Sequence, residues 1–508
     1  MNHVTRTAGR RSLLSSRPWH KTVTSSNHLV STLVEQDFGV PLTIADVHLR
    51  NEQLPFAYFF PQTLCQDQLL VSLSTILPNF PVLGGAVTDV RCLSIQCKTT
   101  DSIPCTFATS DQSLEYWLAQ RNILRRRKSP DLLPLFDPLV SLEENLATIK
   151  ITTLQDGSTV IGMTVNHMVA DAASCFHFLS CWGNHMHDVS SIRSIQHQHN
   201  RLSNDRSLVT CSGMMTHQTA DVMGLVTPET SWTDDLWSIM RLVDNDETPK
   251  QETTNNDDDS DHAYVHLAFP AAVLVAMKAH GMSHSRTPHE THGDIDFVSI
   301  NDMMTAFGWL LKRELSGQAD SNVAMVVNLR GRCGVDTISD NGLFGNGITN
   351  FTADIPEQAT NEEETDQQIS IDGISIAALA IRSSLMEETR DTPDRLTRSR
   401  LGIPPRAAST PTSPCFSTTA WGAFPIWDIQ FGTGAKLVGF HGQPSHPMPP
   451  GDMFASIIVP NGAEDGFTYQ LLAPKDKENQ ARTIHARLCG LFIAWHVERI
   501  EQEAKLHP

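Results

Sequence analysis

Apolar and polar residues recur with two different periods along this chain, which predicts strands and helices in an irregular order. Residues 147–154 and 159–165 are rich in β-branched residues, and an Asp-Gly turn signal at residues 156–157 separates them. Large apolar residues then recur at helical spacing over residues 173–182. The chain is therefore expected to pass from a strand into a helix between these segments.

The same patterns predict further elements on both sides of this region. A helical apolar stripe is followed by Pro78, and Gly84-Gly85 turns the chain toward a strand. Ser299 or Asn301 is the expected cap of an amphipathic helix. The other expected elements are strands at residues 263–269 and 323–329 and helices at residues 271–278 and 372–388. This order favours mixed α/β layers over a regular doubly wound sheet.

The length of 508 residues predicts two domains. Residues 244–261 are acidic and polar and contain no large apolar residue, so they cannot bury enough surface to order themselves. We therefore expect an N-terminal domain at residues 35–235, a flexible acidic linker at 236–262 and a C-terminal domain at 263–508.

Residues 1–34 form a basic leader with five Lys and Arg residues and no acid before Glu35. This composition resembles that of an organelle transit peptide, but we favour a disordered, solvated tail. No apolar core for a secretory signal is present. We therefore expect a cytoplasmic protein, with a mitochondrial location as the alternative.

Composition excludes several classes of function. A net charge of -19 argues against broad nucleic-acid binding, and no apolar run is long enough to span a membrane. Ten cysteines without Cys-x-x-Cys spacing indicate reduced thiols. His185-Met-His187 and His197-Gln-His199 lack a nearby Cys or acid at ligand spacing, so we predict polar loops and no metal site. Residues 342–347 lack the Lys-Ser/Thr of a phosphate loop and predict a turn.

His167 and Asp171 lie four residues apart where the predicted strand meets the predicted helix. A histidine can take up a proton near neutral pH, and a carboxylate can hold the structure around it. By itself this spacing also fits a core histidine beside a helix cap.

Six segments, in order, resemble the plant and fungal acyl-CoA-dependent acyltransferases called the BAHD superfamily, from about residue 64 to about residue 470. They are residues 72–85; His167 to Asp171; Ser299-Ile-Asn-Asp-Met-Met-Thr-Ala-Phe-Gly-Trp309; Val327-Asn-Leu-Arg-Gly-Arg332 with Phe344-Gly-Asn346; Thr419-Ala-Trp421 with Pro425; and Gln430-Phe-Gly-Thr-Gly434. The chain departs from the family pattern at three positions. Ala172 replaces the usual glycine, and Gln430 and Thr433 replace the Asp and Trp of the Asp-Phe-Gly-Trp-Gly motif. We hypothesise that Asp428 substitutes for the missing carboxylate.

The resemblance implies a chloramphenicol-acetyltransferase-like fold of two domains, each a mixed β-sheet with flanking helices, and a solvent channel between them. It implies that His167 is the general base, and that Asp171 is a structural support paired with Arg330 rather than Arg332. It assigns oxyanion stabilisation to Thr419 and Trp421. It places Ser299, Asn301, Arg330, Gly432 and Gly434 at the coenzyme A side.

The implied activity moves an acyl group from acyl-CoA, used as a co-substrate with no permanently bound cofactor. The acceptor is a hydroxyl, or alternatively an amine, of a small secondary metabolite, and the protein is expected to be a monomer. No Gly-x-Ser-x-Gly elbow is present, which favours direct transfer in a ternary complex. One alternative is condensation on carrier-protein thioesters, which Asn166 disfavours because such enzymes carry a second His there. The other is a degenerate binding protein, which only the altered residues 430–434 favour.

Overall fold

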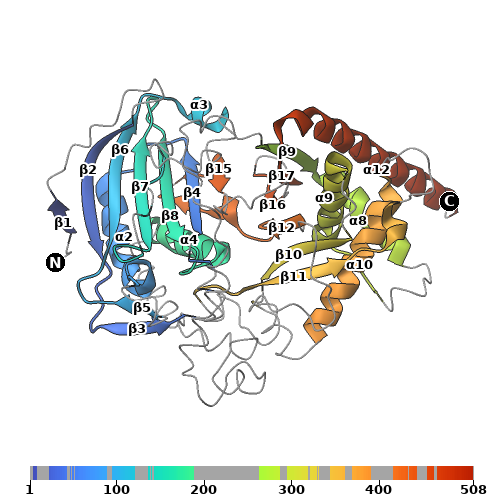
Figure 1. Ribbon diagram of the computed structural model, residues 1–508. Coiled ribbons are helices and arrows are strands. Elements are labelled where there is room, and N and C mark those ends of the chain that lie inside the picture. Colours follow the sequence, from blue (N-terminus) through green and yellow to red (C-terminus); the bar gives the residue numbers. More distant parts are fainter. Residues whose placement is uncertain are drawn as a thin grey trace, which may run out of the picture.

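The computed structural model comprises two halves, each built on its own β-sheet (Figure 1). The structure describes residues 4–7, 22–42, 46, 49–50, 52–87, 94–119, 135–137, 139, 142–187, 262–285, 295–317, 321–328, 330, 344–360, 369–390, 416–432, 434–442, 455–462 and 466–506. The predicted acidic linker, apart from its last residue, lies outside these ranges.

The first half contains a seven-stranded sheet in the order β1-β2-β6-β7-β8-β4-β15. Its strands are β1 Val4–Thr7, β2 Thr22–Ser31, β4 Gln53–Phe60, β6 Ser102–Ser110, β7 Ala147–Thr153, β8 Thr159–Asn166 and β15 Gly439–Gly442. The predicted hairpin is the antiparallel pair β7–β8, and Gly157 in its turn has φ +83°. A small sheet pairs β3 Phe38–Pro41 with β5 Ser94–Cys97.

Both faces of this sheet are buried, because alternate residues of β4 belong to different cores. Phe56, Tyr58 and Phe60 pack under α2 Gln66–Ile76 and α4 Ala172–His187 in the main core. Phe59 packs on the opposite face with Trp117 of α3 Leu114–Ala119. The continuous apolar run of β4 therefore reflects burial on two sides.

The second half contains a six-stranded sheet in the order β11-β10-β12-β16-β17-β9. Its strands are β9 His262–Pro270, β10 Asn322–Asn328, β11 Ile348–Asp354, β12 Phe416–Ala420, β16 Ala455–Pro460 and β17 Gly466–Pro474. Its helices are α8 Ala271–Ser285, α9 Ile300–Ser316, α10 Ile371–Arg390 and α12 Glu478–Leu506. These helices pack on the sheet around a second core. The expected mixed α/β architecture with two sheet-containing domains is confirmed.

Strand β16 joins the two cores. Ile458 packs into the core under the helices of the second half, whereas Ile457 and Val459 belong to the main core of the first half. Because neighbouring residues of a strand point to opposite faces, the outer face of the second sheet packs against the first half.

The chain also crosses back between the halves. Strand β15 pairs antiparallel with β4, with Gly442 opposite Phe56 and Gly439 opposite Phe59. Gln62 Nε2 also donates a hydrogen bond of 3.0 Å to the Gly434 carbonyl. The chain after the acidic linker therefore does not lie wholly in the second half, because strand β15 belongs to the first sheet.

The predicted leader overlaps the first sheet. Strand β2, which we counted with residues 1–34, pairs along its length with β6 and at its other edge with β1. Residues 22–31 are thus part of the fold. Cleavage of the residues before them remains a prediction. Within the described ranges, no helix is both long enough and apolar enough to cross a membrane.

Candidate active site

His167 lies on the loop between β8 and α4, and only 8% of its surface is exposed. Its backbone N–H donates to the Glu52 carbonyl at 2.9 Å, and its own carbonyl accepts from Asn346 Nδ2 at 2.7 Å. The ring Nδ1 is buried and makes no hydrogen bond within the described residues. The loop therefore positions the imidazole through its backbone, and no carboxylate among the described residues accepts a hydrogen bond from Nδ1.

Asn166 shapes the start of this loop. Its side-chain oxygen accepts from the Met168 N–H at 2.9 Å, and its Nδ2 donates to the Arg50 carbonyl at 2.8 Å. The side chain is 3% exposed and both of its polar ends are used locally. Asn166 therefore acts as a turn former at the position where condensation enzymes carry a histidine.

The Asp171 carboxylate lies in a buried hydrogen-bond network. Its Oδ2 accepts from Arg330 Nη1 at 2.6 Å and from the Gly347 N–H at 2.9 Å, and its Oδ1 accepts from the Ser174 N–H at 2.9 Å. Burial raises the pKa of Asp171, but Arg330 and the two backbone N–H donors outweigh burial and lower the pKa below its usual value. Asp171 is therefore held as a carboxylate. Arg332 lies outside the described residues.

Arg330 connects this carboxylate to the loop before β11. Its side chain is 4% exposed, and Nη2 donates to Ser174 Oγ at 3.0 Å and to the Gly345 carbonyl at 2.8 Å. A Cβ on Gly347 would lie 2.7 Å from the guanidinium, so a glycine is required there for close approach. The Arg330 guanidinium is thus bound to the Asp171 loop and to the Gly345 carbonyl. Few of its N–H groups are left for the predicted contact with coenzyme A.

Asn346 is a site residue that our residue assignments omitted. Besides the His167 carbonyl, its Nδ2 contacts Asp46 Oδ1 at 2.8 Å, and the residue is 4% exposed. In the sequence, the Gly-Asn pair at residues 345–346 pointed to this residue, but it served only to support the family resemblance. Asn346 and Arg330 together join the His167 loop to the second half of the chain.

Trp421 lies just after β12 and packs against β4 and against α4, the helix that follows the His167 loop. Its ring centroid is 5.8 Å from Phe56 of β4 and 5.7 Å from Phe176 of α4. Its backbone N–H donates to the Ile458 carbonyl at 2.7 Å, and Thr419 is half-buried two residues earlier. The structure thus brings Trp421 into the core around the site.

The described residues of the altered motif at 430–434 pack against α4. Phe431 is fully buried, and its ring lies 5.0 Å from Trp182 and 5.3 Å from Phe60. Gly432 and Gly434 have φ of +67° and +86°, which favours glycine. Gln430 pairs with Lys436 in the hairpin of β13 Gln430–Phe431 and β14 Ala435–Lys436, whereas Asp428 is exposed. Thr433 lies outside the described residues. The exposed position of Asp428 gives no support to the hypothesis that its carboxylate replaces the one missing at position 430.

We predict that Gly183→Ala destabilises the protein by about 1–3 kcal/mol, as overpacking typically does. A Cβ at Gly183 of α4 would overlap the Gln430 carbonyl oxygen, so β13 and α4 would have to separate. Urea unfolding measures this change. Gly490→Ala on α12 is the matched control, because a Cβ there meets nothing within 4 Å. Equal stability of the two variants would contradict the close packing.

Ser299 and Asn301 lie at the start of α9. The Ser299 side chain accepts from the Asp302 N–H, and Asp302 accepts from the Ser299 N–H at 2.7 Å, which forms a capping box. This confirms Ser299, not Asn301, as the helix cap. Within the described residues, no hydrogen bond or ion pair joins Ser299 to the His167 loop.

Comparisons with known proteins agree with this architecture. The model of the family described as "Transferase family" matches residues 21–449. A malonyl-coenzyme:anthocyanin 5-O-glucoside-6'''-O-malonyltransferase of Salvia splendens is 25% identical over 179 residues, which cover 32% of this chain and 38% of that relative.

Solved structures show a similar fold at low sequence identity. Vinorine synthase is 19% identical with a TM-score of 0.56, and the match covers 90% of this chain and 96% of that one. TRI101 of F. sporotrichioides, complexed with coenzyme A and T-2, is 13% identical with a TM-score of 0.54, covering 88% and 97% of the two chains. The first condensation domain of the CDA synthetase is 13% identical with a TM-score of 0.50, covering 89% and 96%.

Proposed function

This chain belongs to the Transferase family, the BAHD-type acyltransferases, and on that premise we propose that it transfers an acyl group from acyl-CoA to a hydroxyl of a small acceptor. One observation carries the proposal. His167 is fixed by the Asn346 and Asp171–Arg330 contacts on a loop held from both halves of the chain. Such rigid support is what a general base requires, since catalysis depends on its placement.

In the proposed reaction, the His167 imidazole takes the proton of the acceptor hydroxyl as its oxygen attacks the thioester carbonyl. A tetrahedral intermediate forms and collapses by breaking the carbon–sulfur bond. The proton returns from the imidazolium to the departing coenzyme A sulfur. The products are the acylated acceptor and free coenzyme A.

The carboxylate of Asp171 plays no part in moving this proton. Both of its oxygens are occupied by Arg330 and by the backbone N–H groups of Gly347 and Ser174. We infer that Asp171 supports the loop instead, in agreement with its lowered pKa.

We propose that Thr419 and Trp421 donate hydrogen bonds to the oxyanion of the intermediate. If so, Trp421→Phe will lower kcat by about 10²–10³-fold, the typical cost of losing one such donor. Phenylalanine keeps an aromatic ring against Phe56 and Phe176 but removes the indole N–H together with part of the ring volume, so the stability of the variant is measured as well. Steady-state kinetics checks the loss. An unchanged kcat in a stably folded variant would remove Trp421 from this role.

The proposed function is tested by release of free coenzyme A thiol from a panel of acyl-CoA esters, with and without small alcohols. Each alcohol is paired with the amine of the same carbon skeleton, which separates O- from N-acylation. We expect acceptor-dependent thiol release with the alcohols. Thiol release with carrier-protein thioesters instead would favour the condensation reading. Coenzyme A binding without any turnover would favour a catalytically degenerate binding protein, the reading that Gln430 raises.

We also propose that the protein acts as a monomer in the cytoplasm. Sedimentation of the full chain tests the first point. Imaging the full chain, and a reporter protein that carries residues 1–34, tests the second, because a mitochondrial signal that these residues confer on the reporter would establish the transit peptide instead.

A further inference from the structure

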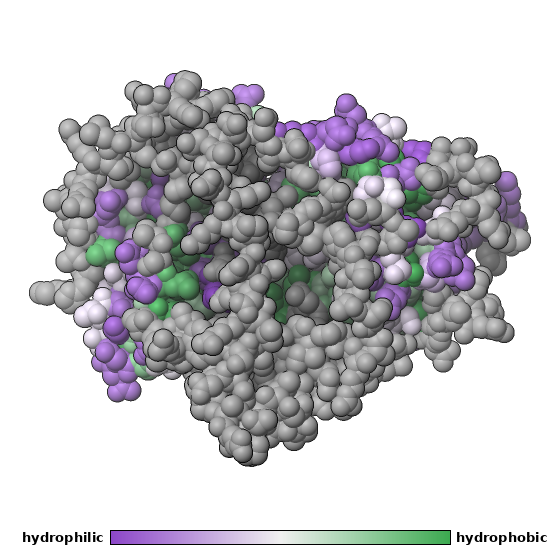
Figure 2. Space-filling view, viewed as in Figure 1, coloured by the Kyte–Doolittle hydropathy of each residue, from purple (hydrophilic) through white to green (hydrophobic). Residues whose placement is uncertain are grey.

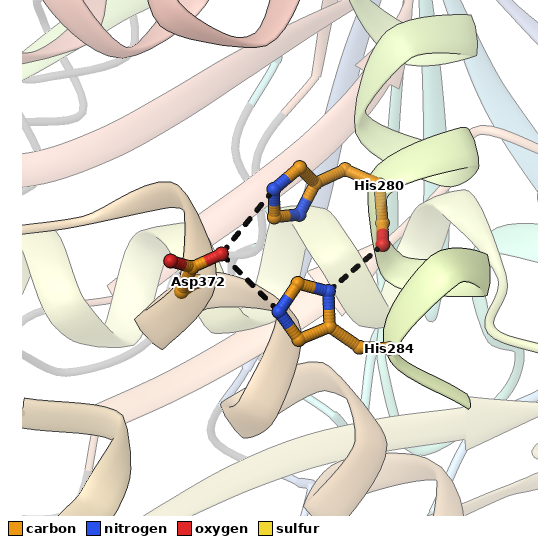
Figure 3. A group of neighbouring side chains, drawn as sticks. All are labelled: His280, His284 and Asp372. Carbon is orange, nitrogen blue, oxygen red and sulfur yellow. Dashed lines mark hydrogen bonds and ion pairs between the residues drawn. The ribbon is translucent and has the colours of Figure 1, made fainter. Parts of the chain in front are cut away.

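Two histidines and an aspartate meet on the helical layer of the second half (Figure 3). His280 and His284 are one helical turn apart on α8, and Asp372 is in the first turn of α10. Asp372 Oδ1 lies 3.4 Å from His280 Nε2 and 3.2 Å from His284 Nε2. The three ligand atoms all lie within 4.8 Å of one another.

The hydrogen bonds of the two rings leave the Nε2 atoms facing the carboxylate. His284 Nδ1 lies 3.1 Å from the His280 carbonyl, which can only accept, and 3.4 Å from Ser283 Oγ, so the tautomer that bonds to the carbonyl has its hydrogen on Nδ1. In a neutral His284, the Nε2 lone pair then faces a carboxylate oxygen at 3.2 Å, which is a repulsive contact. A cation between them converts this contact into an attraction.

The ring of His280 is also held in place. Its Nδ1 lies 2.8 Å from Ser375 Oγ, and the ring packs against Trp495 with centroids 4.5 Å apart. Metal-binding histidines usually have such a partner on the second nitrogen.

Two of the three separations between ligand atoms suit a tetrahedral metal. Bonds of about 2.0–2.1 Å place neighbouring ligand atoms of a tetrahedron about 3.3–3.4 Å apart. The two nitrogen–oxygen separations, 3.4 and 3.2 Å, are close to this value. Imidazole and carboxylate ligands suit zinc-like transition ions, whereas Mg²⁺ and Ca²⁺ prefer oxygen ligands alone.

We propose that His280, His284 and Asp372 bind a zinc-like divalent transition-metal ion that links α8 to α10. Asp372 is 62% exposed and His284 24% exposed, so an ion can enter from solvent, whereas His280 anchors the site at 2% exposure. Solvent completes the coordination. The site shares no residue with the His167 loop and does not depend on the proposed acyl transfer.

The test is calorimetric titration of the full chain, freed of metal by a chelator and dialysis, with Zn²⁺ in excess Mg²⁺. Visible absorption of bound Co²⁺ reports four-coordination, and the melting temperature is followed with and without Zn²⁺. We expect wild type to bind Zn²⁺ and to melt at a higher temperature with it. His284→Gln and Asp372→Asn should weaken binding by more than the roughly 10–100-fold typical of losing a supporting partner.

His496→Gln on α12 is the matched control and should bind as wild type does. Asp372 is well exposed, so Asp372→Asn keeps the test valid even if His284→Gln folds poorly. Absence of Zn²⁺ binding to wild type overturns the proposal. So does binding that both site variants retain, because the ion then lies elsewhere among the 22 histidines.

Discussion

Replacing His167 with alanine is expected to lower kcat by about 10²–10⁴-fold, the usual contribution of a positioned general base. The acceptor hydroxyl then has no group to take its proton. The loop itself should remain in place, because its contacts to Glu52 and Asn346 use the His167 backbone, which alanine keeps. Rates of thiol release and equilibrium binding of coenzyme A should be measured together, and only the rate is expected to change.

His177→Gln is a suitable control for this experiment. His177 lies on α4, the helix that follows the His167 loop, and packs near Phe80 with ring centroids 6.3 Å apart. We expect its turnover to match wild type. A loss of less than tenfold in His167→Ala, with coenzyme A binding intact, would remove His167 from the role of base.

Replacing Asp171 with alanine should destabilise the protein by about 3–5 kcal/mol, because it leaves the Arg330 guanidinium buried without a counter-charge. Turnover should fall as well, since the backbone contacts of Gly347 and Ser174 to this carboxylate are also lost. Urea unfolding measures the stability. The double variant Asp171→Ala/Arg330→Met should be more stable than the sum of the single effects predicts, because it removes both charges.

The same pair gives a pH dependence with a definite sign. The pKa of Asp171 is lowered in the folded protein, so its contribution to stability is present above the unfolded value of about 3.9. This contribution is lost as the pH falls through the lower folded value. Asp171→Asn should lack this acid-induced loss. Two results together would contradict a stabilising ion pair. Asp171→Asn would lose stability in acid as wild type does, and the stability changes of the two single variants would add up in the double variant.

The sequence predicted the elements whose patterns are local. The hairpin β7–β8, the helix after His167 and the capped helix α9 all follow from spacing, turn residues or a cap within one segment. After Gly84-Gly85, the described residues form an isolated bridge between Ala86 and Gln96, and residues 88–93, where the expected strand would continue, lie outside the described ranges. These glycines instead allow close approach, because a Cβ on Gly84 would lie 2.5 Å from Thr32 and one on Gly85 2.6 Å from Ile95.

Contacts between segments that are far apart in the sequence were harder to predict. The pairing of Asp171 with Arg330 came only from the family resemblance, and the role of Asn346 was missed because no local pattern marks an amide as a support for a loop 179 positions away. The cluster of His280, His284 and Asp372 was not predicted from the sequence for the same reason. His280 and His284 showed only a helical spacing, and their acid lies on a different helix.

The return of the C-terminal segment to the first sheet has a consequence for synthesis on the ribosome. Gln62 and the residue whose carbonyl it binds, Gly434, are 372 positions apart. At about 5–20 residues per second, β4 must wait on the order of 20–75 seconds before its edge partner β15 leaves the ribosome. During that interval a strand with four aromatic residues, Phe56, Tyr58, Phe59 and Phe60, presents an unpaired edge. The nascent chain is therefore most vulnerable to aggregation before translation reaches residue 442, and its expression should depend on chaperones that shield this edge.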